Sequence, residues 1–104
     1  AQRRAIDTYH RLSQSDRASD DVEEIVAKAH QGLVQSLLID LDHQVWGTFD
    51  PDTGDVTTHD DEESGDEDLV DLAAIYTLMH GGSTHALEGD DMPDGIRLGA
   101  VYRY

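Results

Sequence analysis

Histidines and runs of acidic residues are the side chains in this sequence best suited to metal binding. His80 and His85 are separated by Gly-Gly-Ser-Thr, which does not give the i, i+4 spacing of two ligands on one helix face. His59 precedes acids at every position of 60–63, which could hold a hard cation weakly. The turn at residues 50–55 (DPDTGD) places Gly54 where a calcium-binding EF-hand loop needs an oxygen ligand. We therefore expect no metal site and no bound cofactor.

Catalysis would need acid, base or nucleophilic groups that the sequence does not bring together. Asp40 and Asp42 form a carboxylate pair, but they lie at the end of an expected strand and have no basic or hydroxyl partner at a suggestive spacing. Ser36 and Ser83 lack the glycine pattern of a nucleophile elbow. The glycine pair at 81–82 follows an expected helix instead of opening one, so it is not a phosphate-binding loop. We expect no catalytic residue in this segment.

Three residues are candidates for contact with a partner protein. Trp46, the single tryptophan, is either a core residue or an exposed anchor on an expected strand. Arg97 and Arg103 are expected on the strand face opposite Tyr102. Two bases on one face of so acidic a chain could mark an interface, and ion pairs with nearby acids are the alternative. We predict partner contacts at Trp46, Arg97 and Arg103.

The charge of the chain restricts its partners. Asp and Glu total 23 and Lys and Arg total 7, which gives a formal net charge of −16. Such a surface repels phosphate backbones and anionic lipids, so we expect no direct nucleic-acid binding and no membrane binding. Because the acids occur in every expected loop, the composition is typical of a halophile's protein, which stays soluble in strong salt through self-repulsion.

Length and composition favour a single soluble, cytoplasmic domain. The 104 residues suit one domain, and the absence of cysteine excludes disulfides and thiolate metal sites. No apolar run approaches the roughly 20 residues that a membrane span needs. The first residues also lack the pattern of a signal peptide.

Helical periodicity is clear in the first third of the chain. Apolar residues at helical spacing predict a helix over residues 3–13, followed by a polar link at 13–19. The pair Asp20 and Glu23 has the spacing of a capping box and predicts the start of a second helix. Gly32 suits the left-handed position that ends such a helix.

Strand signals dominate the middle of the chain. The aliphatic run at residues 33–41 is too short for another helix and predicts a buried central strand. Residues 45–49 and 56–59 predict the two strands of a hairpin, joined by the Pro- and Gly-containing turn.

One further helix and two strands are expected toward the C-terminal end. The helix is predicted from the capping-box pair Ser64 and Glu67 to about His80, and its nearly continuous apolar residues indicate deep packing. Short strands are predicted at residues 84–87 and 96–104, the second with period-two alternation.

This alternation of strands and helices predicts an α/β fold. We expect a three-layer α/β/α sandwich with a mixed, mostly parallel sheet. The acidic β-hairpin at residues 42–68 is expected to be an insertion into it. Residues 1–18 are expected to be an incoming helix and linker from a preceding domain, and residues 19–104 to be the α/β/α domain itself.

Several motifs occur in a characteristic order. They are DVEEIVAKAHQGLVQSLLI, then LVDLAAIYTLMHGGSTHAL, and finally LGAVYRY at the end of the chain. This order resembles the C-terminal domain of archaeo-eukaryotic class 1 peptide-chain release factors and pelota. The segments VWGTFDPDTG, GDEDLVDLAAI and MHGG are more similar to the bacterial and haloarchaeal release-factor-like branch of that superfamily. The resemblance covers residues 20–104.

The resemblance implies a fold shared with kink-turn-binding ribosomal proteins. It also implies docking to a translational GTPase, to the ribosome or to a sibling domain of the parent chain. Peptide release in the family depends on a Gly-Gly-Gln loop in a separate middle domain, whereas residues 81–83 read Gly-Gly-Ser. Catalysis by a longer parent protein therefore depends on whether it carries that loop elsewhere.

Two departures from the family pattern limit what the resemblance implies. RNA-binding relatives carry a Gly-Thr-Asn-Glu type turn, and residues 18–21 here read Ala-Ser-Asp-Asp, with acids where RNA needs hydrogen-bond donors. Archaeal release factors can carry a cysteine-ligated zinc insertion, and the corresponding segment at residues 42–68 has no cysteine.

The sequence therefore favours a non-catalytic protein-interaction domain of a release-factor-like, ribosome-associated protein. The alternatives are an RNA-binding domain of the same fold and an unrecognised small enzyme. Binding to RNA that survives molar salt would favour the first alternative, and a pocket with convergent polar groups would favour the second.

Overall fold

A computed structural model describes residues 2–103 and shows helices and strands close to those expected. Most boundaries lie within a residue or two of the prediction, because the predicted apolar periods coincide with the buried faces. The elements are α1 Gln2–Leu12, β1 Ala18–Ser19, α2 Val22–His30, β2 Val34–Asp40, β3 Trp46–Asp50, β4 Asp55–His59, β5 Glu67–Asp68, α3 Leu69–Met79, β6 Ser83–Leu87, the 3₁₀ turns η1 Gly89–Asp91 and η2 Pro93–Gly95, and β7 Leu98–Tyr102.

The main sheet is mixed, with strand order β1-β7-β2-β6. The α/β class and the mixed sheet are confirmed, but the expectation of a mostly parallel sheet is wrong. Only β2 and β6 pair in parallel, and β7 is antiparallel to both β1 and β2. The reason is that the β6–β7 connection consists of two short 3₁₀ turns, which reverse the chain instead of carrying it back through a crossover helix.

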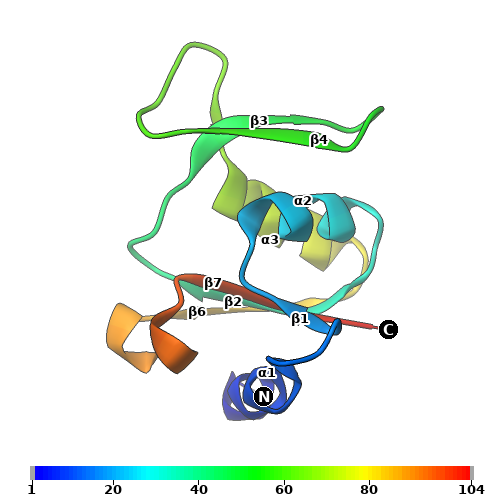
Figure 1. The fold of residues 1–104 in the computed structure, drawn as a ribbon, viewed down its shortest axis with the longest axis vertical. Coiled ribbons are helices and arrows are strands. Elements are labelled where there is room, and N and C mark those ends of the chain that lie inside the picture. The colour runs from blue at the N-terminus through cyan, green and yellow to red at the C-terminus, as the bar shows by residue number, and fades with distance from the viewer. Residues whose placement is uncertain (1, 104) are drawn as a thin grey trace.

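Helices cover both faces of this sheet, as Figure 1 shows. Helix α1 lies against one face, while α2 and α3 lie against the other, and the β3–β4 hairpin forms a further layer beyond them. Two hydrophobic cores follow from this layering. The core beneath α1 contains Ala5, Tyr9, Leu38, Leu87, Met92 and Val101. The larger core on the α2 and α3 side contains Ile25, Val26, Ala29, Val34, Leu37, Leu69, Val70, Ala73, Leu98, Ala100 and Tyr102.

Helix α1 is packed against the sheet through its predicted apolar face. Ala5 and Tyr9 are buried there, and Leu12 packs beside them. The segment after the helix was expected to be only a polar link, but Ala18 and Ser19 form β1, which pairs with β7. The assignment of residues 1–18 to a segment that arrives from a preceding domain stays a prediction.

The hairpin packs against helices instead of extending freely into solvent. Its two strands pair antiparallel, and β5 adds a third strand beside β3. Three rings join the layers: His30 of α2, Phe49 of β3 and Tyr76 of α3 contact one another edge to face, with centroid separations of 5.0 to 5.9 Å. The acidic segment is therefore anchored on the helices by an aromatic cluster.

Both predicted capping boxes are displaced from the true helix starts. Asp21, not Asp20, caps α2, because its carboxylate accepts a hydrogen bond from the Glu23 backbone N–H. Asp68 caps α3 by accepting from the Val70 N–H at 3.1 Å, so the predicted start at Ser64 is wrong. At α2, Asp20 and Asp21 are adjacent and either one fits the pattern of a cap followed three residues later by Glu. At α3, Ser64 lies in the acidic loop, four residues before the true cap.

Two expectations about apolar residues are also corrected. The alternation predicted for residues 96–104 would place Ile96 on the same face as Leu98, Ala100 and Tyr102. Ile96 instead precedes β7 and packs on the α1 side, whereas the other three residues face α2 and α3. The last position of the predicted strand, residue 104, lies outside the described residues. Helix α3 is not packed on every side, and its exposed face is the most distinctive surface of the molecule.

Candidate functional site

Helix α3 presents a row of large apolar side chains to solvent. Ile75, Leu78 and Met79 keep 46%, 58% and 70% of their surface exposed. Their i, i+3, i+4 spacing places them on one face of the helix, which we call the α3 patch. The other sides of α3 are occupied, since Leu69, Val70 and Ala73 lie in the larger core and Thr77 is buried.

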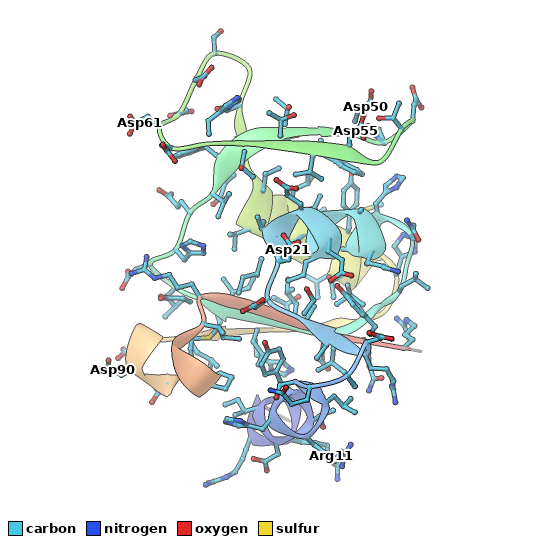
Figure 2. All side chains as sticks on the ribbon, viewed as in Figure 1. Arg11, Asp21, Asp50, Asp55, Asp61 and Asp90 are labelled. Carbon is cyan, nitrogen blue, oxygen red and sulfur yellow. The ribbon has the colours of Figure 1, made fainter. Side chains whose placement is uncertain are left out.

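The rest of the surface is strongly acidic. Figure 2 shows Asp50, Asp55 and Asp61 projecting outward from the hairpin region, and Asp90 projecting from the η1 turn. Asp71 is exposed one helical turn before Ile75 on α3. Of these acids, only Asp71 is placed next to the α3 patch by its position on the helix, and an exposed apolar patch on an otherwise charged surface is typical of a protein-binding site.

Trp46 lies at the start of β3 in the three-stranded sheet, on a different element from the α3 patch. It is half-buried, and its backbone is paired between His59 of β4 and Asp68 of β5. It is therefore neither a fully buried core residue nor a freely exposed anchor. Its predicted contact with a partner stays a prediction.

The structure does not bring the two predicted arginines together. Arg97 and Arg103 flank the two ends of β7. They are six residues apart on extended chain, so their backbones are separated by about 20 Å. Arg97 is exposed, and its carbonyl accepts a hydrogen bond from the Asp40 N–H. His43 lies nearby: burial first, and then the charge of Arg97, lower its pKa.

Arg103 holds the C-terminal ends of two helices. Its Nε donates to the Gly32 carbonyl at 3.0 Å and its Nη2 donates to the His80 carbonyl at 2.9 Å. Its backbone N–H also donates to the Leu33 carbonyl. Helix C-terminal carbonyls have no partner within the helix and carry a partial negative charge, so a guanidinium satisfies both needs.

A histidine–carboxylate network organises the acidic loop after β4. His59 Nδ1 lies 2.9 and 3.1 Å from the two carboxylate oxygens of Asp66, whose side chain is only 1% exposed. The Glu63 N–H donates to the same carboxylate. The hydrogen bond to Asp66 raises the pKa of His59. Desolvation would raise the pKa of Asp66, but the hydrogen bonds from Glu63 and His59 outweigh it, so that pKa is lowered.

We expect Asp66→Asn to lower the pKa of His59 toward its ordinary value of 6.5. The raised pKa of His59 means that its contribution to stability is fully present below pH 6.5 and fades as the pH rises through the folded-state pKa. The lowered pKa of Asp66 means that the contribution of this carboxylate is lost as the pH falls through its own folded-state pKa. An NMR titration of the His59 ring proton measures the change. Asp61→Asn removes the same charge from the same loop without touching the network. An equal change of the His59 pKa in both variants would show that general charge, not the Asp66 contact, sets it.

The parallel pairing of β2 with β6 creates a polar cluster that sequence reasoning did not find. Ser83 Oγ donates to Ser36 Oγ at 3.3 Å, and His85 Nε2 lies 3.2 Å from Ser83 Oγ. The cluster lines a small hollow beside α1. Only the register of β2 against β6 places Ser36 opposite Ser83, and no local sequence signal gives that register.

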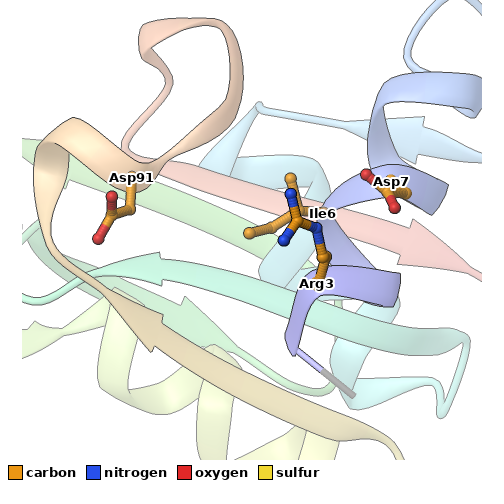
Figure 3. A pocket seen from close by; sticks show the side chains of 4 residues that line it. All are labelled: Arg3, Ile6, Asp7 and Asp91. Atoms are coloured by element: carbon orange, nitrogen blue, oxygen red, sulfur yellow. The ribbon is translucent and has the colours of Figure 1, made fainter.

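Two other hollows are shallow and mixed or acidic in character. One, of about 410 Å³, is lined by Arg3, Ile6 and Asp7 of α1 and by Asp91. Figure 3 shows Asp91 of η1 across this hollow from Arg3 and Ile6. The other, of about 400 Å³, is lined by residues 41–42 and 88–90, which include three acids.

The described part of the chain contains neither a cluster of metal ligands nor a membrane-spanning helix. Among the side chains that the structure describes, no three of His, Cys, Asp or Glu lie close enough to share a metal ion. No helix within residues 2–103 is long and apolar enough to cross a membrane.

Comparison with known proteins identifies a similar fold. No protein-family model matches the chain, and no curated protein matches it. Among solved structures, the chain is similar to the C-terminal domain of a peptide chain release factor from Methanosarcina mazei. That similarity has a TM-score of 0.66 at 14% sequence identity, and it covers 99% of this chain and 81% of the other.

Proposed function

We propose that this chain is a non-catalytic protein-interaction domain of a release-factor-like, translation-associated protein, and that the α3 patch is its docking surface for a translational GTPase. The fold it shares with an archaeal release-factor C-terminal domain supports the link to translation. The order of its sequence motifs supports the same link. The exposed α3 patch is the single observation that carries the interaction role.

The α3 patch has a composition that the fold itself does not require. Ile75, Leu78 and Met79 leave about half or more of their surface in water, so polar side chains there would cost the core little. Full burial of such a side chain from water contributes about 1.5–3 kcal/mol, and burial of the exposed part of each one against a partner contributes the corresponding share. Three adjacent side chains therefore supply the apolar centre that a specific interface needs.

Charge argues for a protein as the occupant and against an RNA surface. The formal charge of −16 repels phosphate backbones at any distance that salt does not screen. A protein surface with an apolar centre and basic side chains complements both the α3 patch and the acidic surface of the rest of the molecule. A translational GTPase is the protein partner implied by the release-factor resemblance, and ribosomal proteins and sibling domains of the parent chain are the other candidates.

The entry to α2 also argues against RNA binding through this fold. Its turn contains Asp20 and Asp21, and the Asp21 carboxylate is engaged by the Glu23 N–H as the helix cap. Ser19 Oγ in turn accepts from the Asp21 N–H. The turn that would have to approach RNA therefore presents carboxylates and uses its own polar groups internally.

Photo-crosslinking from position 79 tests the proposed occupant. We expect a photoreactive amino acid in place of Met79, the most exposed residue of the α3 patch, to crosslink to a translational GTPase in growing cells. Leu41 is similarly exposed at 60% and lies outside the patch, so the same amino acid at position 41 is the matched control. Mass spectrometry of the adducts identifies the partner. Adducts from position 79 that contain only ribosomal RNA, or that match those from position 41, would contradict the proposal.

A further inference from the structure

The sheet face beneath α1 is only partly covered. Helix α1 packs on β7 and β2, whereas β6 lies beyond β2 at the edge of the sheet. A helix about 10 Å across spans roughly two strands at their spacing of about 4.8 Å. A hollow of about 230 Å³ therefore remains between α1 and the edge of the sheet. It is lined by Arg4, Ala5, Thr8, Gln35, Ser36, Ser83 and His85.

The residues of β6 explain why this hollow is polar. Ser83, His85 and Leu87 alternate onto the α1 face of the strand. Leu87 closes one end, where it is buried with Leu38 in the core beneath α1. At the other end the side chains are Ser83 and His85, and β2 contributes Ser36 beside them. The same face thus changes from apolar core to hydrogen-bonding groups within one strand.

The hydrogen bonds among Ser36, Ser83 and His85 leave one hydroxyl donor of the cluster unused. Because Ser83 uses its only hydroxyl hydrogen toward Ser36, His85 must donate its Nε2 hydrogen to Ser83 Oγ. The hydroxyl hydrogen of Ser36 is then available for a further acceptor. Thr8 and Gln35 line the same hollow and add hydroxyl and amide donors.

The lining of the hollow contains an arginine and no acidic residue, whereas the molecule as a whole is strongly acidic. Although 23 of the 104 residues are acidic, none of the seven lining residues is a carboxylate. Arg4 is exposed at the rim and makes no ion pair with any side chain that the structure describes. An unpaired guanidinium beside several hydroxyl groups is the donor set that recognises a phosphate oxyanion.

We propose that this hollow binds the phosphate group of a small phosphomonoester or of free inorganic phosphate, held by the Arg4 guanidinium and the hydroxyl groups of Ser36 and Ser83. The volume is below the range of about 300–1,000 Å³ that holds drug-sized ligands, so only a compact group fits fully inside. The site lies on the α1 side of the sheet, so it is separate from the α3 patch and independent of the proposed docking function.

Titration of the ¹⁵N-labelled chain with inorganic phosphate and, separately, with phenyl phosphate tests this site, at an ionic strength held constant with sodium chloride. We expect saturable amide shifts confined to residues near the hollow. Arg4→Gln and the Ser36→Ala/Ser83→Ala double variant should each weaken binding about tenfold or more, because each removes hydrogen bonds to a charged group. The control is Arg11→Gln, which removes the same charge from the far end of α1.

The two probes separate the two sources of phosphate. Saturation by both shows that the phosphate group alone is recognised, and saturation by phenyl phosphate alone assigns the site to a phosphomonoester. Arg4 is exposed, so Arg4→Gln should keep the amide spectrum of the folded chain. Shifts that do not saturate with either probe, or equal affinities for Arg4→Gln and Arg11→Gln, would overturn the assignment.

Discussion

Replacing Arg103 by methionine is expected to lower the free energy of unfolding by about 2–3 kcal/mol, because two hydrogen bonds from a charged donor are lost at once. The Gly32 and His80 carbonyls, at the ends of α2 and α3, would lose the guanidinium that now satisfies both. Methionine keeps the aliphatic stem of the side chain, so the change isolates the guanidinium. Urea denaturation measures the difference.

Arg97→Met is the matched control, since it removes the same charge at the other end of β7. Arg97 is exposed, and its guanidinium makes no hydrogen bond or ion pair with any side chain that the structure describes, while its backbone carbonyl accepts from the Asp40 N–H. A change within about 0.5 kcal/mol is expected there. Equal losses for the two variants would mean that net charge, not the clamping of two helix ends, underlies the effect of Arg103.

Gly47→Ala is expected to cost about 3 kcal/mol or more, because the hairpin approaches this glycine too closely for any side chain. A Cβ at position 47 would lie 2.0 Å from the Thr57 carbonyl oxygen and 2.9 Å from Leu69 Cδ1. The first contact is with the backbone of the paired strand β4, so β3 and β4 would have to separate. The hairpin layer should then detach from α3. Fluorescence of Trp46, the single tryptophan and the direct neighbour of Gly47, should report that change.

Gly54→Ala is the control for Gly47→Ala, because it introduces backbone strain without steric overlap. Gly54 has φ of +81° in the hairpin turn, and an added Cβ there meets no atom within 4 Å. Its cost should be limited to the roughly 1–2 kcal/mol of a left-handed residue. A Gly47→Ala variant as stable as Gly54→Ala would show that β3 does not approach β4 and Leu69 as closely as described.

The elements that the sequence predicted well are those with a strong local signal. The strand at residues 33–41 and the helix ended by Gly32 were expected within about two residues of β2 and α2. Dense aliphatic residues and a glycine with φ of +79° mark these elements without help from tertiary contacts. The sheet direction could not be predicted in the same way, because it depends on where β7 inserts between β1 and β2.

The candidate surfaces could not be predicted because each depends on contacts between distant segments. The α3 patch could not be predicted from the sequence, because α3 is apolar on nearly every side. Packing against α2, the main sheet and the hairpin determines which face of the helix stays exposed. The hollow joins Ser36 and Ser83, which are 47 residues apart. The role of Arg103 was missed, although the glycines that end α2 and α3 signal helix carbonyls in need of a donor.

The affinity of the purified chain for the translational GTPase of its host tests the central claim most directly, through one pair of variants. We predict that Leu78→Asp weakens binding at least about tenfold, because it removes an apolar contact and places a charge in its position. Leu41→Asp makes the same substitution at an equally exposed leucine outside the α3 patch and should leave the affinity within about twofold. Equal affinities for the two variants, or no binding by the unaltered chain, would contradict the assignment of α3 as the docking surface.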